Sequence, residues 1–126
     1  MGTVVLVLVV LILAYAIGMP WYAGGRAKRA VGKPIPAVGP VVDASRPALV
    51  YFFSPTCGPC RQMAPTLEAL RQEGAAIHKV DVSQDLASAM AYGVMVTPTT
   101  VAVRDGRVAE VVVGMAGMER LKKLLA

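Results

Sequence analysis

The sequence predicts a three-layer α/β domain with a mixed central sheet, preceded by one N-terminal transmembrane helix. Three observations support this prediction. The chain opens with an uncharged apolar stretch, short apolar runs then alternate with amphipathic segments, and an Asp-Gly pair joins the last two runs. Such alternation is typical of α/β folds, and Asp-Gly between alternating segments is a strong hairpin signal. We divide the chain into an anchor (1–23), a basic linker (24–40) and an α/β domain (41–126).

The anchor is predicted from its length and its lack of charge. Residues 2–25 carry no charged side chain, and 56% of the whole chain is hydrophobic. As a helix, residues 3–23 would extend over roughly 31 Å, which matches a hydrocarbon core about 30 Å thick. A cleaved signal peptide usually carries positive charge before its apolar run, and a buried helix of a soluble fold usually has a polar face. We therefore expect an uncleaved anchor, with these two as the alternatives.

The predicted linker, residues 24–40, is rich in glycine and proline, which disfavours regular structure. It also holds a cluster of four of the 13 basic residues, namely Arg26, Lys28, Arg29 and Lys33. The remaining nine basic residues and all eight acids lie in the domain, so the net charge of the domain is near +1. This charge gives no indication of nucleic-acid binding. The positive-inside rule places the side with the cluster in the cytoplasm; an extracytoplasmic domain is the alternative.

The first half of the domain is predicted to be a strand followed by a helix. Residues 48–53 form an apolar run of the length expected for a strand that is buried on both faces. Ser54-Pro55-Thr56 interrupts this run. A helix should then extend from about Cys57 to Glu73, because apolar residues recur at helical spacing and Gly74 follows as a terminator.

The second half completes the order β-α-β-α-β-β-α. Residues 76–82 are predicted to be a strand and 84–91 a short helix. Two further strands, 99–104 and 107–113, flank the Asp-Gly pair, and 118–125 form an amphipathic helix. A helix connects the first two strands, so these should be parallel, whereas the last two should be antiparallel.

The two cysteines of the chain lie two residues apart where the first helix should begin. Helix N-terminal N–H groups and the helix dipole stabilise an anion at this position, which lowers a thiol pKa. We expect Cys57 to be the attacking thiolate. Cys60, one turn further and more buried, should resolve the mixed disulfide, and Gly58 and Pro59 shape the turn between them.

The rest of the sequence disfavours other uses of the two cysteines. A structural zinc site needs four ligands, and His78 is the one histidine available beside them. Covalent haem attachment needs His after the second cysteine, where the chain has Arg61. A bridge over two residues adds little loop entropy as a structural staple. We expect redox chemistry without a metal or an organic cofactor.

Residues 46 to 126 resemble the thioredoxin superfamily. The resemblance is carried by several separated motifs in the right order: FFSPTCGPC at 52–60, Pro65, YGVMVTPT at 92–99, Asp105-Gly106 and Val113-Gly114. It implies a thioredoxin-like fold and thiol–disulfide exchange on protein substrates. Pro98 matches the family's cis-proline, which faces the disulfide, and the Thr97 backbone would pair with an extended substrate. Gly93, Val96 and Gly114 match the apolar surface that receives partners.

The chain departs from the family pattern at two active-site positions. Thr56 stands where the family has Trp, and Tyr51 stands where it has a buried Asp that is thought to shuttle a proton for the resolving thiol. Lys79 matches the Lys beside that Asp. A phenol with an ordinary pKa near ~10 is a poor base at neutral pH, so we expect slow resolution by Cys60. The family's first strand and helix are shortened or missing, since only residues 38–45 are left for them.

The sequence therefore predicts a membrane-tethered disulfide reductase. The Gly58-Pro59 dipeptide is the one found in the reducing members of the family. Expected partners are protein disulfide substrates, an electron-donating reductase and the membrane, but no nucleic acid. An oxidase or isomerase of the same fold is one alternative. A non-catalytic interaction module in a membrane complex is the other.

Overall fold

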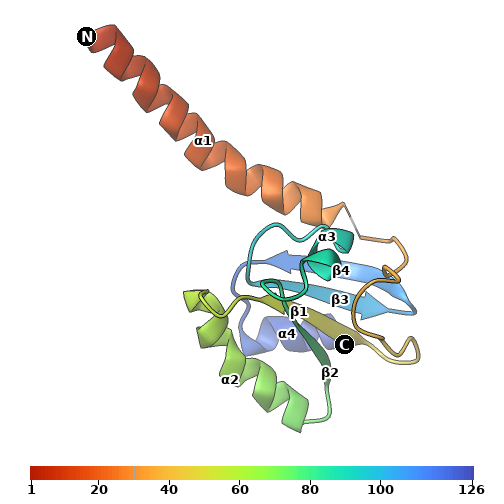
Figure 1. Ribbon diagram of the computed structural model, residues 1–126. Helices are drawn as coiled ribbons and strands as arrows, with labels where there is room; N and C mark the ends of the chain where they lie inside the picture. Colours follow the sequence, from red (N-terminus) through yellow and green to blue (C-terminus); the bar gives the residue numbers. More distant parts are fainter. Residues whose placement is uncertain (30) are drawn as a thin grey trace.

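The structure is a computed structural model that describes residues 1–29 and 31–126. Its elements follow the predicted order, with one long helix before the domain (Figure 1). They are α1 (Gly2–Lys28), β1 (Ala48–Phe53), α2 (Gly58–Gln72), β2 (Ala76–Asp81), α3 (Leu86–Ala91), β3 (Thr99–Arg104), β4 (Arg107–Val113) and α4 (Met118–Leu125).

The four strands form one mixed sheet in the order β2-β1-β3-β4. β1 pairs with β2 in parallel, whereas the β1–β3 and β3–β4 pairs are antiparallel, which confirms the predicted directions. The central strand β1 is therefore paired along both of its edges. Asp105 and Gly106, both at positive φ, form the turn of the predicted hairpin between β3 and β4.

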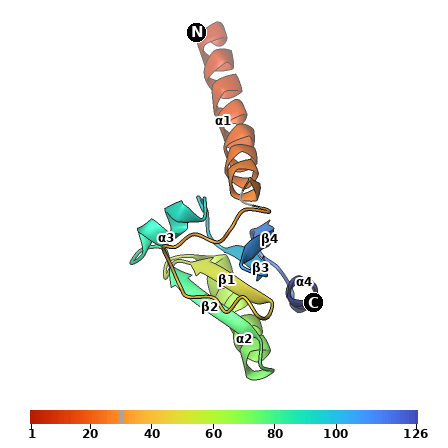
Figure 2. The same ribbon diagram turned by 90° about the vertical axis from the view of Figure 1, so that its right-hand side faces the viewer.

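The sheet is covered on both faces, giving three layers (Figures 1 and 2). Successive residues of a strand point to opposite faces, and β1 shows this alternation. Leu49 and Tyr51 pack into the core beneath α2 and α4. Val50 and Phe52 pack into the second core on the side of α3, together with Tyr92. The residues that follow β1 therefore leave the sheet between the layer of α2 and α4 and the layer of α3.

Helix α1 is long and apolar enough over Gly2–Tyr22 to cross a membrane, and none of this segment is buried against the domain. In both views it extends away from the sheet (Figures 1 and 2). The helix continues to Lys28, so the first five residues of the predicted linker are helical, which differs from our expectation. A further part of that predicted linker, Ala30, lies outside the described residues.

The rest of the linker is also more ordered than its composition indicated. The N–H of Gly32 donates to the carbonyl of Val108 at 2.7 Å, and the N–H of Val108 donates to the carbonyl of Lys33 at 2.9 Å. The N–H of Ile35 donates to the carbonyl of Gly106 at 3.0 Å. These bonds cover the start of the free edge of β4, where an edge strand would otherwise expose its backbone groups. Residues 38–45 form neither strand nor helix.

Tyr92 provides a test of the packing on the α3 side. Its ring lies 5.3 Å from that of Phe52 and is 2% exposed, and burial raises the pKa of its hydroxyl. Within the described residues this hydroxyl has no hydrogen-bond partner. Tyr92→Phe should therefore keep or raise the free energy of unfolding, by up to about 1 kcal/mol. Tyr92→Ala should lower it by about 3–5 kcal/mol, because it leaves a cavity.

The free energies are measured by pulse proteolysis of the full chain in urea with detergent micelles. A loss of more than about 1 kcal/mol in Tyr92→Phe would show that the hydroxyl is hydrogen-bonded in solution.

Candidate active site

The end of β1 positions the cysteine motif. After Phe53 the chain turns, and the N–H of Cys57 donates to the carbonyl of Ser54 at 3.1 Å. Cys57 has extended backbone angles (φ −82°, ψ 114°) and is the N-cap of α2. Pro59 lies in the first helical turn, where a missing N–H costs no helical hydrogen bond. The sequence predicted a helix starting at about Cys57, and the structure begins it one residue later.

Cys57 and Cys60 form a disulfide, with their Cα atoms 5.2 Å apart. The two sulfurs differ in access, because Cys57 is half-buried whereas Cys60 is only 4% exposed. The N–H of Cys60 donates to Sγ of Cys57 at 3.2 Å. This bond and the helix N-terminus would both stabilise negative charge on Cys57 once the disulfide is reduced. The environment of Cys57 is therefore the one that an attacking thiolate requires.

The register of the sheet brings Pro98 to the same end of the molecule. Phe52 of β1 lies opposite Thr99 of β3, so the residue before Thr99 lies beside the end of β1. The Thr97–Pro98 peptide bond is cis, and Pro98 is buried. The loop before β3 and the turn before Cys57 therefore meet at the same end of these two central strands.

The Pro98 loop is held by hydrogen bonds on both sides. The N–H of Gly114 donates to the carbonyl of Pro98 at 2.8 Å, and Oγ1 of Thr99 donates to the carbonyl of Val96 at 2.7 Å. Gly114 has φ +95°, a left-handed conformation that favours glycine. In the described parts of the chain, the backbone N–H and C=O of Thr97 have no partner.

A groove of about 410 Å³ joins this loop to the turn before Cys57. Met95 and Val96 are exposed by 41% and 39%, so they present apolar surface along this groove. Gly93, at φ +71°, turns the chain from α3 into the loop. The groove is lined by Ser54, Val82, Leu86, Ala89, Val94, Met95, Val96 and Thr97. Of the predicted surface residues, Val96 and Thr97 line this groove.

Tyr51 and Lys79 face each other across the β1–β2 pair. The Tyr51 hydroxyl donates to the carbonyl of Cys60 at 3.3 Å, and its ring stacks on Phe53 with centroids 5.8 Å apart. Burial raises the pKa of Tyr51 above its ordinary value. The hydroxyl therefore stays protonated at neutral pH and acts as a donor, so it does not take a proton from Cys60 as a carboxylate would.

Thr56 is exposed, and its side chain shares a 3.0 Å hydrogen bond with Ser54. It stabilises the turn rather than presenting an aromatic surface. Phe53, Arg61 and Ala64 lie around the buried side of the cysteine pair and were not predicted as site residues. The two-residue periodicity of β1 could have placed Phe53 on the same face as Tyr51.

Among residues 1–29 and 31–126, no three His, Cys, Asp or Glu side chains gather into a group that could hold a metal ion. The chemistry that the arrangement supports is exchange at the sulfur pair itself. The absence of a metal or cofactor from the reaction stays a prediction.

Comparison with known proteins agrees with this geometry. Residues 39–126 match the family model described as Thioredoxin. The chain belongs to the thioredoxin family. It is 42% identical to thioredoxin of Streptomyces clavuligerus over 76 residues, which cover 59% of this chain and 71% of that protein. It is also 42% identical to thioredoxin of Bacillus subtilis over 80 residues, 61% of this chain and 77% of that one.

The fold agrees with solved thioredoxins as well. The structure matches a mutant thioredoxin from Halobacterium salinarum with a TM-score of 0.61 at 38% identity, covering 65% of this chain and 74% of the other. Family membership and the paired cysteines make the protein a thioredoxin-like disulfide oxidoreductase. The family as a whole acts on protein disulfides together with a reductase.

Tyr51 is expected to slow the second step of exchange. Tyr51→Asp introduces a carboxylate opposite Lys79, where it can accept the Cys60 proton. The rate of mixed-disulfide resolution should rise by about tenfold or more, because positioned general bases contribute roughly 10²–10⁴-fold. Stopped-flow measurement of substrate-thiol release from a preformed mixed disulfide gives this rate.

Tyr51→Phe is the matched control, since it keeps the ring and removes only the bond to the Cys60 carbonyl. Its resolution rate should stay within about fivefold of wild type, because one neutral hydrogen bond contributes about 1 kcal/mol or less to such a balance. An unchanged rate in Tyr51→Asp, in a folded variant, would rule out the idea that Tyr51 limits resolution.

Proposed function

We propose that this protein reduces protein disulfides at a membrane surface to which α1 tethers it. The observation that carries the proposal is the environment of Cys57. This sulfur is half-buried at the N-cap of α2, whereas its partner Cys60 is shielded. The Gly58-Pro59 dipeptide between them is the one that the resemblance associates with reduction.

The proposed cycle uses the two sulfurs alone. The Cys57 thiolate attacks a substrate disulfide, forms a mixed disulfide and releases the first substrate thiolate. The Cys60 thiolate then attacks Sγ of Cys57 and releases the second one. The Cys57–Cys60 disulfide remains, and a donor dithiol returns two electrons and two protons to it. No metal or organic cofactor takes part in these steps.

Substrate is proposed to dock across the Pro98 loop. The unpaired backbone of Thr97 would bond an extended segment of the substrate, as in strand addition. Val96 offers an exposed apolar contact beside it, and Gly93 and Gly114 shape the loop on its two sides. Pro98 forms the buried wall of this arrangement.

The tether is proposed to be an uncleaved span. The uncharged 21-residue span of α1 extends away from the domain, and four basic residues follow within the next eleven positions. By the positive-inside rule the domain lies on the cytoplasmic side, where a soluble reductase can supply electrons directly. A domain on the other side would need electrons carried across the bilayer.

Insulin reduction tests the proposed chemistry. Full chain in detergent with dithiothreitol as donor should accelerate insulin precipitation, and Cys57→Ser should lose that acceleration because it lacks the attacking thiolate. Cys60→Ser should instead accumulate a mixed disulfide that is visible by mass spectrometry. Equal rates for wild type and Cys57→Ser would leave a non-catalytic interaction module as the function.

The reduction potential decides the direction of exchange. A value near ~−270 mV, the figure known for thioredoxin itself, fits a reductase, and one near ~−120 mV would indicate an oxidant. Equilibration of the protein with glutathione buffers measures it.

Labelling in intact cells tests the side of the membrane. Cys57 should be protected from a membrane-impermeant thiol reagent and should react after permeabilisation, because the basic cluster retains the domain in the cytoplasm. The intact mass of the purified protein shows whether residues 1–23 are retained. Labelling without permeabilisation would place the domain outside, and a mass lacking those residues would replace the tether with a signal peptide.

A further inference from the structure

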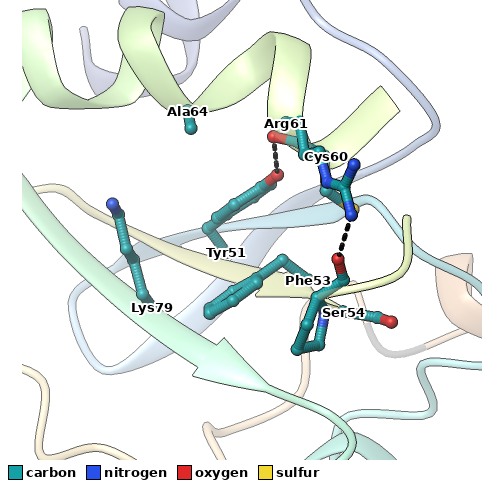
Figure 3. Close-up of a pocket in the computed structure, with 8 residues that line it drawn as sticks. Tyr51, Phe53, Ser54, Cys60, Arg61, Ala64 and Lys79 are labelled. Carbon is teal, nitrogen blue, oxygen red and sulfur yellow. Dashed lines mark hydrogen bonds between the residues drawn. The ribbon is translucent and has the colours of Figure 1, made fainter. Parts of the chain in front are cut away.

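An apolar cavity of about 190 Å³ lies behind the cysteine pair, on the side of the sheet that α2 covers (Figure 3). It is distinct from the groove beside the Pro98 loop, with which it shares only Ser54. The steps proposed for exchange do not use it. Its lining consists of Tyr51, Phe53, Ser54, Pro55, Cys60, Arg61, Ala64 and Lys79.

The walls of this cavity suit an aromatic ring. Tyr51 and Phe53 stack nearly parallel, with 10° between their ring planes, and Ala64 of α2 lies across the cavity from them (Figure 3). The Tyr51 hydroxyl is hydrogen-bonded to the Cys60 carbonyl, so Tyr51 lines the cavity with its ring. An apolar cavity of about 150 Å³ is known to hold benzene, so the volume here is sufficient for one ring.

The charges around the cavity are of one sign. Arg61 and Lys79 are both among its lining residues, and no acid is. Arg61 donates to the carbonyl of Pro55 at 3.0 Å, which holds its guanidinium on the side of Cys60, away from Lys79 (Figure 3). The acid nearest to Lys79 along β2 is Asp81, whose Oδ1 accepts bonds from Ser83 at 2.9 and 2.6 Å. An anion beside the Lys79 ammonium would therefore meet no acid among the residues that line the cavity.

We propose that this cavity binds a small aromatic carboxylate, with its ring against Tyr51 and Phe53 and its carboxylate toward Lys79. The apolar walls account for the ring, and the Lys79 ammonium accounts for the anionic group. Such a ligand contacts the buried Cys60 and leaves the more accessible Cys57 uncovered. This binding site is independent of the direction of exchange and of the side of the membrane.

The test uses the full chain in lipid nanodiscs with 4-fluorobenzoate as the probe. Fluorine NMR measures binding, and the carbon-13 shift of the Ala64 methyl locates it. 4-Fluorobenzyl alcohol lacks the charge and should bind about fivefold more weakly, the effect of one exposed ion pair. Acetate lacks the ring and should not shift the Ala64 methyl.

Lys79→Met should lower the affinity for 4-fluorobenzoate to that for the alcohol, because it keeps the aliphatic stem and removes the charge. Lys123→Met, on the exposed face of α4, is the matched control and should bind like wild type. Ala64→Leu should fill the cavity and reduce binding by about tenfold or more, since the ring then has no space. If that variant does not fold, the comparison of wild type with Lys79→Met still tests the proposed site.

Three results would overturn the proposal. One is 4-fluorobenzoate binding that is equal in wild type and Lys79→Met. Another is saturation of the fluorine signal without a shift of the Ala64 methyl. The last is the same fluorine signal from nanodiscs that contain no protein, which would mean that the probe only enters the lipid.

Discussion

The pairing of β1 on both edges is the constraint on which the site depends. Each residue from Ala48 to Phe52 has a partner in β2 and another in β3, so the strand has no freedom to slip. A slip by one residue would turn every side chain of β1 to the opposite face. Tyr51 would leave α2, and the end of β1 would no longer lie beside Thr99 and the Pro98 loop. The register of one strand therefore determines where the thiol chemistry takes place.

The same register places Tyr51 in contact with both Cys60 and the cavity behind it. On the α2 face its hydroxyl reaches the carbonyl of Cys60, one helical turn beyond Cys57. A carboxylate at this position would accept protons, whereas the phenol, with its pKa raised by burial, only donates. Its ring, stacked on Phe53, also forms one wall of the cavity behind Cys60. The phenol at this position is thus both a hydrogen-bond donor to Cys60 and an apolar wall.

Local patterns predicted most of the domain. The strands at 48–53, 99–104 and 107–113 and the helix at 118–125 have the predicted bounds, because apolar runs and the Asp-Gly turn mark their ends within the sequence itself. The pairing of Gly32, Lys33 and Ile35 with the start of β4 was not predictable in this way. It joins segments more than 70 residues apart through backbone groups, which carry no residue-specific signal. The cavity behind Cys60 depends likewise on α2 crossing β1.

That unexpected pairing restricts how the proposed tether can work. α1 ends at Lys28, and Gly32 is already bonded to Val108, so only three residues lie between the helix and the sheet. The four steps from Lys28 to Gly32 span at most about 14 Å when fully extended. Helix from Tyr22 to Lys28 adds about 9 Å. A long flexible linker would let the domain explore a wide volume, whereas this connection holds it within a domain diameter of the bilayer. Disulfides that approach the membrane surface would therefore encounter Cys57 at a high effective concentration, and distant ones would not.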